Sequence, residues 1–265
     1  MPTQILKALK NAGRGVEILR STAQTPQWAT ISAAYLGLRS LRYPFVLRLR
    51  TGEQIRIEEL TDLKTFWQIF LRQIYRVQGT DRVILDLGAN IGLFSLYAAR
   101  QAPQAHVFAL EPFPSTFQRL TATVRDHGLE SRVVCLNYAA TGSPGIRLMP
   151  NSAVPSQRRS IAASSSGKDG AQVEGKTLEE ILNENQIADL DLLKIDIEGS
   201  EYEVLLSTPL PVLRRIHRIA LEYHGDSAPY SKQQLFDHLR KAGFAPRWDV
   251  CDPLGYGVTE MANNQ

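Results

Sequence analysis

Cysteine is scarce in this sequence. The 265 residues include only two cysteines, Cys135 and Cys251, and their spacing matches no metal-ligand motif. Cys135 lies inside an apolar, strand-like run, where a small buried hydrophobe is expected. We therefore predict no zinc site, and we expect a reducing, intracellular setting.

Long hydrophobic segments are also missing. No apolar stretch reaches the roughly 18 to 20 residues that a membrane-spanning helix needs. The first residues carry scattered charges where a signal peptide has an apolar core. Because the hydrophobic share of 43% and the charged share of 22% are ordinary for a globular protein, we expect a soluble, cytoplasmic protein with a full core.

Acidic charge is nearly absent from the beginning of the chain. Residues 1–50 contain eight basic residues and one acidic residue, Glu17, although the net charge of the whole chain is only +3. A solvated helical face is the favoured interpretation, and the alternative is a surface that meets phosphates, acidic lipids or an anionic substrate. A weak contact of this basic segment with a membrane surface, which would make the protein peripheral to the membrane, stays open.

The order of the apolar patterns predicts an α/β protein. Residues 45–60 alternate apolar and charged side chains on both sides of Thr51-Gly52, which is typical of a β-hairpin. Asp62 is predicted to cap the helix that follows. From residue 83 onward, short apolar runs alternate with helical segments, the pattern of a parallel sheet with helices on both faces.

Seven runs in this part of the chain are assigned to strands. In chain order they are RVILDLG, HVFALEP, RVVCLNYA, DLLKIDIEG, HRIALEYH, FAPRWDV and GYGVTEMA. The helices expected between them span residues 94–100, 114–127, 177–185, 200–206 and 232–242. Residues 151–176 are predicted to form an insertion, either a mobile loop or a short hairpin, in which Arg158 and Arg159 are more readily solvated than bound to a substrate.

The chain is accordingly divided into three parts. These are a basic helical extension over residues 1–44, a hairpin and helix over 45–78, and a core over 79–265. Three aromatic residues near strand ends, Tyr223, Tyr230 and Trp248, are candidates for stacking on a sugar ring. Packing in the core is their favoured interpretation.

The segment VILDLGANIGLFSLYAA, residues 83–99, carries the first chemical signal. Gly88 and Gly92 allow a tight turn between a strand and a helix, whose free backbone N–H groups can face a ligand. Their spacing differs from the G-x-G-x-x-G of dehydrogenases, so a dinucleotide of that type is disfavoured. Glu111 ends the next strand, where an acidic side chain can accept hydrogen bonds from both hydroxyls of a ribose. Together these features predict an adenosine-containing ligand.

Two pairs of polar residues end later strands. Asp196 and Glu198 stand two residues apart in KIDIEG, and Glu222 and His224 stand two residues apart in ALEYH. Residues two apart on an extended chain point the same way, and ligands of such sheets bind beyond the carboxyl ends of the strands. We therefore expect both pairs at a binding site, with a helix cap as the alternative role for one of the first two.

These segments, together with ALEPFPSTFQRL and TLEEIL, resemble the S-adenosylmethionine-dependent methyltransferases of the FkbM type, in the same order and at similar spacings. The resemblance covers about residues 45–225. It implies the Rossmann-like, seven-stranded sheet of class I methyltransferases, mostly parallel with an antiparallel last strand. It also implies S-adenosylmethionine as cofactor, S-adenosylhomocysteine as product, and methylation of oxygen atoms on sugars, glycans or natural products.

The resemblance also implies which residues contact the cofactor. Its methionine part is expected over the glycine loop, its ribose at Glu111, and its sulfonium near Asp196. Asn137, Tyr138 and Ala139 fall at the edge of the adenine pocket, although many such enzymes have an aspartate there. The complete set is Asp86, Gly88, Ala89, Asn90, Gly92, Glu111, Pro112, Phe113, Asn137, Tyr138, Ala139 and Asp196.

The predicted catalytic residues are Asp196, Glu198, Glu222 and His224. Methyl transfer to a hydroxyl requires alignment of the acceptor and removal of its proton, and we expect acid/base help from Asp196 and His224. A divalent cation held at Asp196, Glu222 and His224 is left open, and no metal is assigned. Lys194 is placed on the other face of the sheet, with local pairing as its role.

The leading hypothesis is therefore O-methylation of a small-molecule or glycan hydroxyl. Nucleic-acid methylation is one alternative, suggested by the basic N-terminus, but the chain lacks the Asn/Asp-Pro-Pro-aromatic motif of amino-base methylation, so no nucleic-acid partner is expected. The other alternative is a noncatalytic, membrane-peripheral scaffold that keeps the fold.

Overall fold

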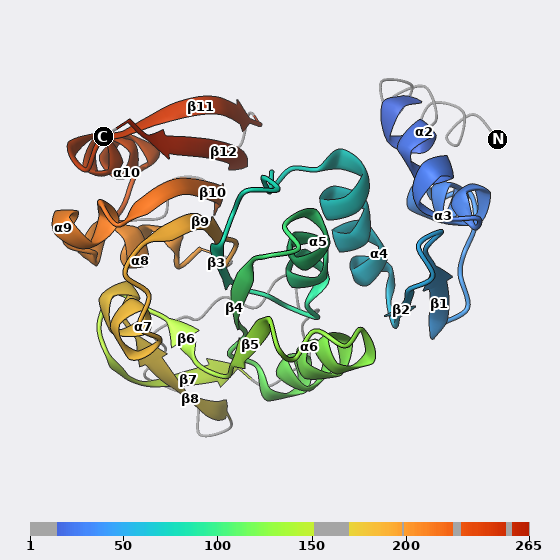
Figure 1. Ribbon diagram of the computed structural model, residues 1–265, viewed down its shortest axis with the longest axis horizontal. Coiled ribbons are helices and arrows are strands. Elements are labelled where there is room, and N and C mark those ends of the chain that lie inside the picture. The colour runs from blue at the N-terminus through green and yellow to red at the C-terminus, as the bar shows by residue number, and fades with distance from the viewer. Residues whose placement is uncertain (1–14, 151–169, 198, 225–228, 253–255, 265) are drawn as a thin grey trace. The chain divides into compact units, whose positions relative to one another are not determined.

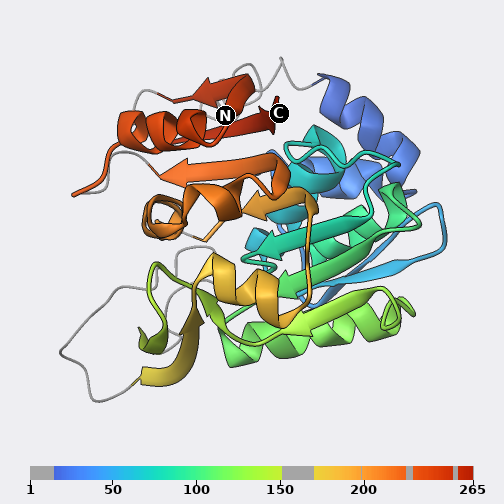
Figure 2. The ribbon, with the colours of Figure 1, turned by 60° about the vertical axis from the view of Figure 1, so that its left-hand side comes forward.

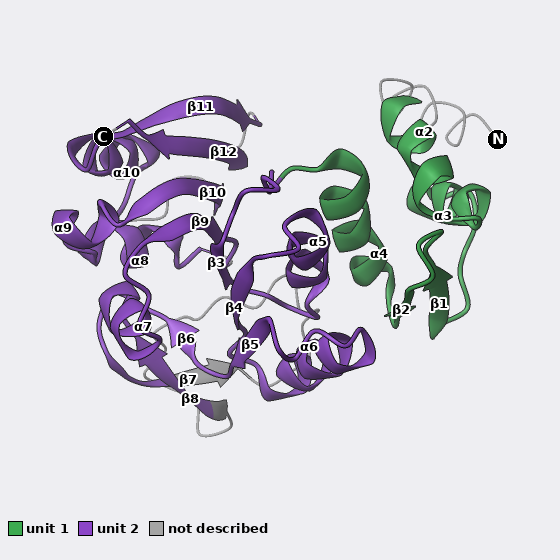
Figure 3. Ribbon diagram, viewed as in Figure 1, with its two compact units in different colours: residues 1–74 green, residues 75–265 purple. Residues whose placement is uncertain are grey.

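A computed structural model describes residues 15–150, 170–197, 199–224, 229–252 and 256–264 (Figure 1). The predicted catalytic residue Glu198 and the loop residues Arg158 and Arg159 lie outside these ranges. The chain forms two compact units, residues 1–74 and residues 75–265 (Figure 3). In the described part of the chain, no helix combines the length and the apolar character needed to cross a membrane.

The first unit contains helices and one hairpin. Its elements are α2 (Gly15–Gln24), α3 (Trp28–Tyr35), β1 (Phe45–Arg48), β2 (Gln54–Ile57), α4 (Leu60–Phe66) and the π-helix η2 (Trp67–Arg72). β1 and β2 pair antiparallel, which confirms the predicted hairpin. Asp62 is not the cap of α4 but lies in its first turn, where its carboxylate accepts the backbone N–H groups of Glu58 and Glu59 in a capping box.

Seven strands form the central sheet of the second unit. They are β3 (Val83–Leu87), β4 (His106–Leu110), β5 (Val133–Leu136), β9 (Leu190–Ile195), β10 (Ile216–His224), β11 (Phe244–Cys251) and β12 (Tyr256–Asn263). Their order across the sheet is β11-β12-β10-β9-β3-β4-β5. The five strands from β10 to β5 pair parallel, whereas β12, the last in the chain, runs antiparallel to both of its neighbours. This topology confirms the predicted Rossmann-like methyltransferase sheet.

Helices cover both faces of this sheet (Figure 2). They are α5 (Leu93–Gln101), α6 (Pro114–Asp126), α7 (Leu178–Glu184), α8 (Glu201–Ser207), α9 (Leu210–Leu213) and α10 (Lys232–Lys241). Helices α7 to α10 bury their apolar residues in one cluster with Leu85, Leu193 and Leu221 of the sheet. Helix α5 packs on the other face, where Ser95 contacts Asp86 of β3. Apart from the short α9, these helices were predicted from the sequence.

A smaller sheet flanks the insertion. It consists of β6 (Ala139–Ala140), β7 (Gly145–Pro150) and β8 (Gly170–Lys176), in the order β6-β8-β7. β7 and β8 pair antiparallel, and residues 151–169, most of the predicted insertion, lie outside the described residues. The predicted strand RVVCLNYA is divided, because β5 ends at Leu136 and the following alanines join this second sheet.

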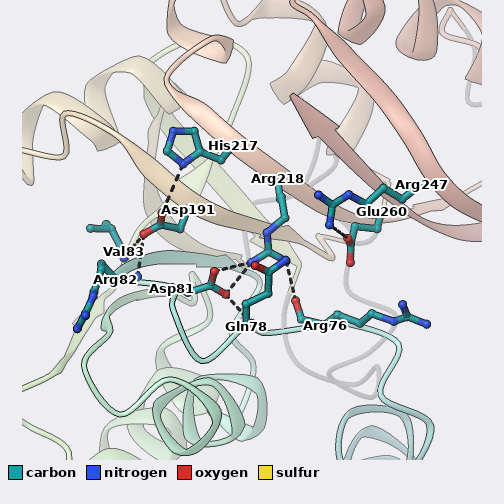
Figure 4. Close-up of polar contacts among 10 residues, drawn as sticks. All are labelled: Arg76, Gln78, Asp81, Arg82, Val83, Asp191, His217, Arg218, Arg247 and Glu260. Atoms are coloured by element: carbon teal, nitrogen blue, oxygen red, sulfur yellow. Dashed lines mark hydrogen bonds and ion pairs between the residues drawn. The ribbon is translucent and has the colours of Figure 1, made fainter. Parts of the chain in front are cut away.

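Buried polar contacts fix the end of the sheet where β3, β9 and β10 begin (Figure 4). The Arg218 guanidinium donates to both carboxylate oxygens of Asp81, at 2.7 and 2.6 Å, and to the carbonyl of Arg76 at 3.1 Å. Asp191 accepts the backbone N–H of Val83 at 2.9 Å. These strands are parallel, so contacts that fix their starts relative to one another also align their carboxyl ends, where the candidate site lies.

Candidate active site

The loop between β3 and α5 has a left-handed backbone at three positions. The φ angles are 76° at Gly88, 51° at Asn90 and 84° at Gly92, a region that favours glycine. A Cβ on Gly88 would collide with the backbone oxygen of Asp196, and one on Gly92 would lie 2.8 Å from the Leu120 side chain. The bare backbone at Gly88 is thus required by the close approach of the β9 strand end.

Glu111 directly follows β4, and its side chain turns back toward this loop. Its two carboxylate oxygens accept the backbone N–H groups of Asn90 and Phe113, both at 3.0 Å, and the residue is only 5% exposed. Burial raises the pKa of Glu111 to about 7, although both backbone donors act to lower it. Additional donors, such as two ribose hydroxyls, would stabilise the ionised carboxylate further.

The residues predicted at the adenine pocket point in different directions. The Asn137 side chain donates to the carbonyls of Glu111 and Pro112, at 2.8 and 3.2 Å, and so holds the turn after β4. Ala139 shares a small apolar cluster with Phe113 and Val173. Tyr138, between Asn137 and Ala139, packs into the main core instead, and its hydroxyl accepts a hydrogen bond from Asn185 at 3.2 Å.

A buried ion pair lies beneath the glycine loop. Lys194 Nζ is 3.0 Å from Asp86 Oδ1, and Ser95 donates to Asp86 Oδ2 at 2.8 Å. Lys194 also donates to the carbonyls of Leu87 and Gly88, at 3.2 and 2.8 Å. Burial acts to lower the pKa of Lys194, but nearby carboxylates, above all that of Asp86, raise it above its ordinary value. Asp86 therefore holds Lys194 in place, and Lys194 in turn holds the backbone at the start of the loop.

The placement of Lys194 on the other face of the sheet was wrong. Lys194 stands two residues before Asp196, so the alternation of a strand puts both side chains on one face. Lys194 Nζ lies 5.5 Å from the ring centroid of Tyr75, whose hydroxyl in turn contacts Asp196. Local pairing, the role expected for Lys194, is confirmed by the contact with Asp86.

Tyr75 joins the carboxyl ends of β9 and β10. Its hydroxyl lies within donating distance of Asp196 Oδ2, at 3.1 Å, and of Glu222 Oε2, at 2.9 Å. The ring packs edge-on against Phe94, with centroids 5.6 Å apart. Burial and the two carboxylates raise the pKa of Tyr75 well above its usual range, so the hydroxyl keeps its proton. Tyr75 was not predicted, because it precedes β3 in a segment without a motif.

His224 is paired with a second residue that was not predicted. Its Nδ1 lies 2.7 Å from Oε1 of Glu201, the first residue of α8. The Glu201 side chain is fully buried, whereas the His224 side chain is 18% exposed. The His224 ring also meets Tyr256 edge-on, with centroids 5.7 Å apart. The sequence signal that could have indicated Glu201 is its position in the KIDIEGSE segment, two residues after Gly199.

The contacts thus join two of the predicted catalytic residues, Asp196 and Glu222, through Tyr75, and place His224 against Glu201. In the described ranges, no group of three or more His, Cys, Asp or Glu side chains is arranged to hold a metal ion.

The aromatic candidate Tyr223 is a core residue, fully buried, with its hydroxyl donating to Asp249 at 2.7 Å.

Comparison with known proteins assigns the chain to a family. The methyltransferase FkbM domain matches residues 86–245, which is more than half of the chain and runs from Asp86 through His224. The chain belongs to the FkbM methyltransferase family. This match confirms the resemblance seen in the sequence, and the glycine loop, Glu111 and both strand ends lie within the matched region.

Relatives of this FkbM-family chain differ in length and in the activities that their names state. Hexuronic acid methyltransferase AglP from Haloferax volcanii is 25% identical over 238 residues, which cover 84% of this chain and 90% of AglP. The 31-O-demethyl-FK506 methyltransferase FkbM from Streptomyces tacrolimicus is 28% identical over 190 residues, covering 59% of this chain and 72% of that protein. AMB antimetabolite synthetase AmbE from Pseudomonas aeruginosa is 29% identical over 238 residues, which cover 74% of this chain but only 11% of AmbE.

Proposed function

We propose that this FkbM-family protein transfers a methyl group to a hydroxyl oxygen of a sugar, glycan or natural product. The names of two relatives support this acceptor class, since one acts on a hexuronic acid and the other on a 31-O-demethyl compound. One observation carries the proposal for this chain. The backbone oxygen of Asp196 lies so close to Gly88 that a Cβ there would collide with it, so the strand end with the predicted catalytic acid lies against the predicted cofactor loop.

The residues around the glycine loop fit S-adenosylmethionine, which supplies a methyl group on a sulfonium sulfur. Glu111 would accept the ribose hydroxyls, because its buried carboxylate, with a pKa raised to about 7, gains from further donors. Phe113 and Ala139 pack with Val173 in a buried apolar cluster, which would border the adenine. The left-handed backbone at Gly88 and Gly92 forms the tight turn against which the methionine part would lie.

The strand-end residues would then act on the acceptor. In the proposed reaction the acceptor hydroxyl gives its proton to His224 while its oxygen bonds to the methyl carbon, and the electron pair of the broken carbon–sulfur bond stays on sulfur. Asp196 orients the hydroxyl, and the Tyr75 hydroxyl holds the Asp196 carboxylate in place.

The test combines calorimetric binding of S-adenosylmethionine with transfer of its labelled methyl group to a panel of hexuronic acids, glycosides and hydroxylated natural products. We expect Asp196→Ala and His224→Ala to bind the cofactor and to lose about 100-fold or more in turnover, the usual contribution of general acid–base catalysis. His217→Ala is the matched control, because His217 is an exposed histidine at the opposite end of the same strand.

Unchanged turnover in both variants would rule out Asp196 and His224 as the catalytic pair. Transfer of the label to RNA or DNA, with none to a small-molecule hydroxyl, would contradict the proposed acceptor class.

A further inference from the structure

We propose that Glu201 is a positioning residue that fixes the tautomer of His224 and stabilises its protonated form. This inference rests on the proposed role of His224 as the base. It concerns a residue outside the predicted catalytic set, and it is carried by the contact between a buried carboxylate and a partly exposed imidazole.

The geometry defines which ring nitrogen Glu201 holds. Glu201 Oε1 lies 2.7 Å from His224 Nδ1, a distance typical of a charge-assisted hydrogen bond. We take Glu201 as ionised; an ionised carboxylate only accepts hydrogen bonds, so Nδ1 then carries the hydrogen in this contact. The acceptor proton therefore arrives at the second ring nitrogen, Nε2.

The burial of Glu201 makes this contact favour the protonated form of His224. The Glu201 side chain is fully buried, and within the described residues its second oxygen, Oε2, has no hydrogen-bond partner. A buried carboxylate is unfavourable unless a positive or donating group faces it. An imidazolium at His224 supplies that charge, so proton transfer to His224 is favoured by the same contact that orients the ring.

Position in the fold supports the assignment. Glu201 is the first residue of α8, which directly follows the loop after Asp196, and His224 is the last residue of β10. The pair thus connects α8, the helix after the β9 strand end, to the end of the neighbouring strand β10. A shift of either element would turn the imidazole, which is why we assign Glu201 to positioning.

The first experiment reads the tautomer directly, without cofactor or acceptor. NMR of isotope-labelled histidine ring nitrogens distinguishes a hydrogen on Nδ1 from one on Nε2, and the His224→Gln variant identifies the His224 signal among the five histidines. We expect the Nδ1–H form in the wild-type protein and its loss in Glu201→Leu. Glu201→Gln keeps an acceptor oxygen, so we expect it to retain the Nδ1–H form while losing the negative charge.

The second experiment measures kinetics with the acceptor found for the protein. We expect Glu201→Leu to lower kcat by about 100-fold and Glu201→Gln by a smaller factor, with the dissociation constant of S-adenosylmethionine unchanged within about twofold. Glu203→Leu is the matched control, because Glu203 lies in the same helical turn but its carboxylate accepts the Gly142 N–H, at 3.1 Å. Thermal unfolding of each variant confirms that it is folded.

The outcomes separate this inference from the proposed function. If Glu201→Leu keeps the wild-type tautomer, or keeps the wild-type kcat in an enzyme that needs His224, Glu201 has no positioning role. If His224→Ala retains full turnover, the proposed base is wrong, and the NMR experiment then decides whether Glu201 fixes the ring.

Discussion

Replacing Lys194 by methionine removes the positive charge beneath the glycine loop. The change leaves the Asp86 carboxylate, now 3.0 Å from Lys194 Nζ, buried without its cation. It also removes the donor from the carbonyls of Leu87 and Gly88. Because methionine is close to lysine in length and shape, the effect reports the loss of charge and hydrogen bonds more than a loss of packing.

The magnitude follows from the burial of the pair. Both side chains are almost fully buried, with exposures of 3% for Lys194 and 0% for Asp86. Removing one partner of such a pair lowers the free energy of unfolding by about 3–5 kcal/mol, because an uncompensated buried charge remains. For a domain of this size, that corresponds to a fall in melting temperature of about 6–20 °C.

A double-mutant cycle tests the cause. Asp86→Asn removes the other charge, so the double variant Asp86→Asn/Lys194→Met contains no buried charge at this position. We expect its destabilisation to be smaller than the sum of the two single changes by about 1–3 kcal/mol. Urea unfolding followed by circular dichroism measures the three variants, and strictly additive changes would refute the reasoning.

Neutral pH is the right condition for this cycle. The pKa of Lys194 in the folded chain lies above its ordinary value, so its contribution to stability is complete below the unfolded pKa of about 10.4. The contribution is lost only as the pH rises through the folded value. Unfolding measured near pH 7 therefore reports the whole effect of the ion pair.

Two further predictions concern Glu111 and Gly88, which we propose to lie at the cofactor site. The pKa of Glu111 is about 7, and ribose hydroxyls would favour its ionised form, so calorimetry should show S-adenosylmethionine binding about tenfold weaker at about pH 6 than at about pH 8. The Glu111→Gln variant should bind weakly at both pH values. If the affinity of the wild-type protein does not change over that range, the assignment of Glu111 to the ribose is wrong. Gly88→Ala should lower the free energy of unfolding by more than about 2 kcal/mol, from left-handed strain plus the collision with Asp196. Gly128→Ala is the control, because φ at Gly128 is 62° but no atom lies within 4 Å of the added Cβ, so denaturant unfolding should show the cost of the backbone strain alone. If both variants lose the same free energy of unfolding, the collision with Asp196 contributes nothing.

Much of the fold could be predicted because its signals are local. The alternation of short apolar runs with helical segments identified all seven strands of the main sheet. The glycine spacing and Glu111 after the next strand indicated an adenosine-containing ligand, and the two-residue alternation placed Asp196 and Glu222 at strand ends, where Tyr75 contacts both. The same rule, correctly applied, places Lys194 on the Asp196 face.

Boundaries were less predictable where tertiary contacts set them. The run after Arg132 reads as one strand, yet Ala139 and Ala140 leave the main sheet to pair with β8. Asp62 suits a helix cap, but Glu59 takes that position because the reciprocal capping box satisfies more backbone groups. Several conformations satisfy the local preferences in each case, and pairing with distant residues selects one of them.

The sequence by itself determined the class of sheet, the place of the glycine loop and the residue types at the strand ends. Only the tertiary structure decided their partners: Tyr75 with Asp196 and Glu222, Glu201 with His224, and Lys194 with Asp86. These contacts depend on the strand order, which puts β9 between β3 and β10 and brings Tyr75 to residues more than a hundred positions later in the chain. Local periodicity tells which face a side chain takes, but only the folded sheet determines which side chain it meets there.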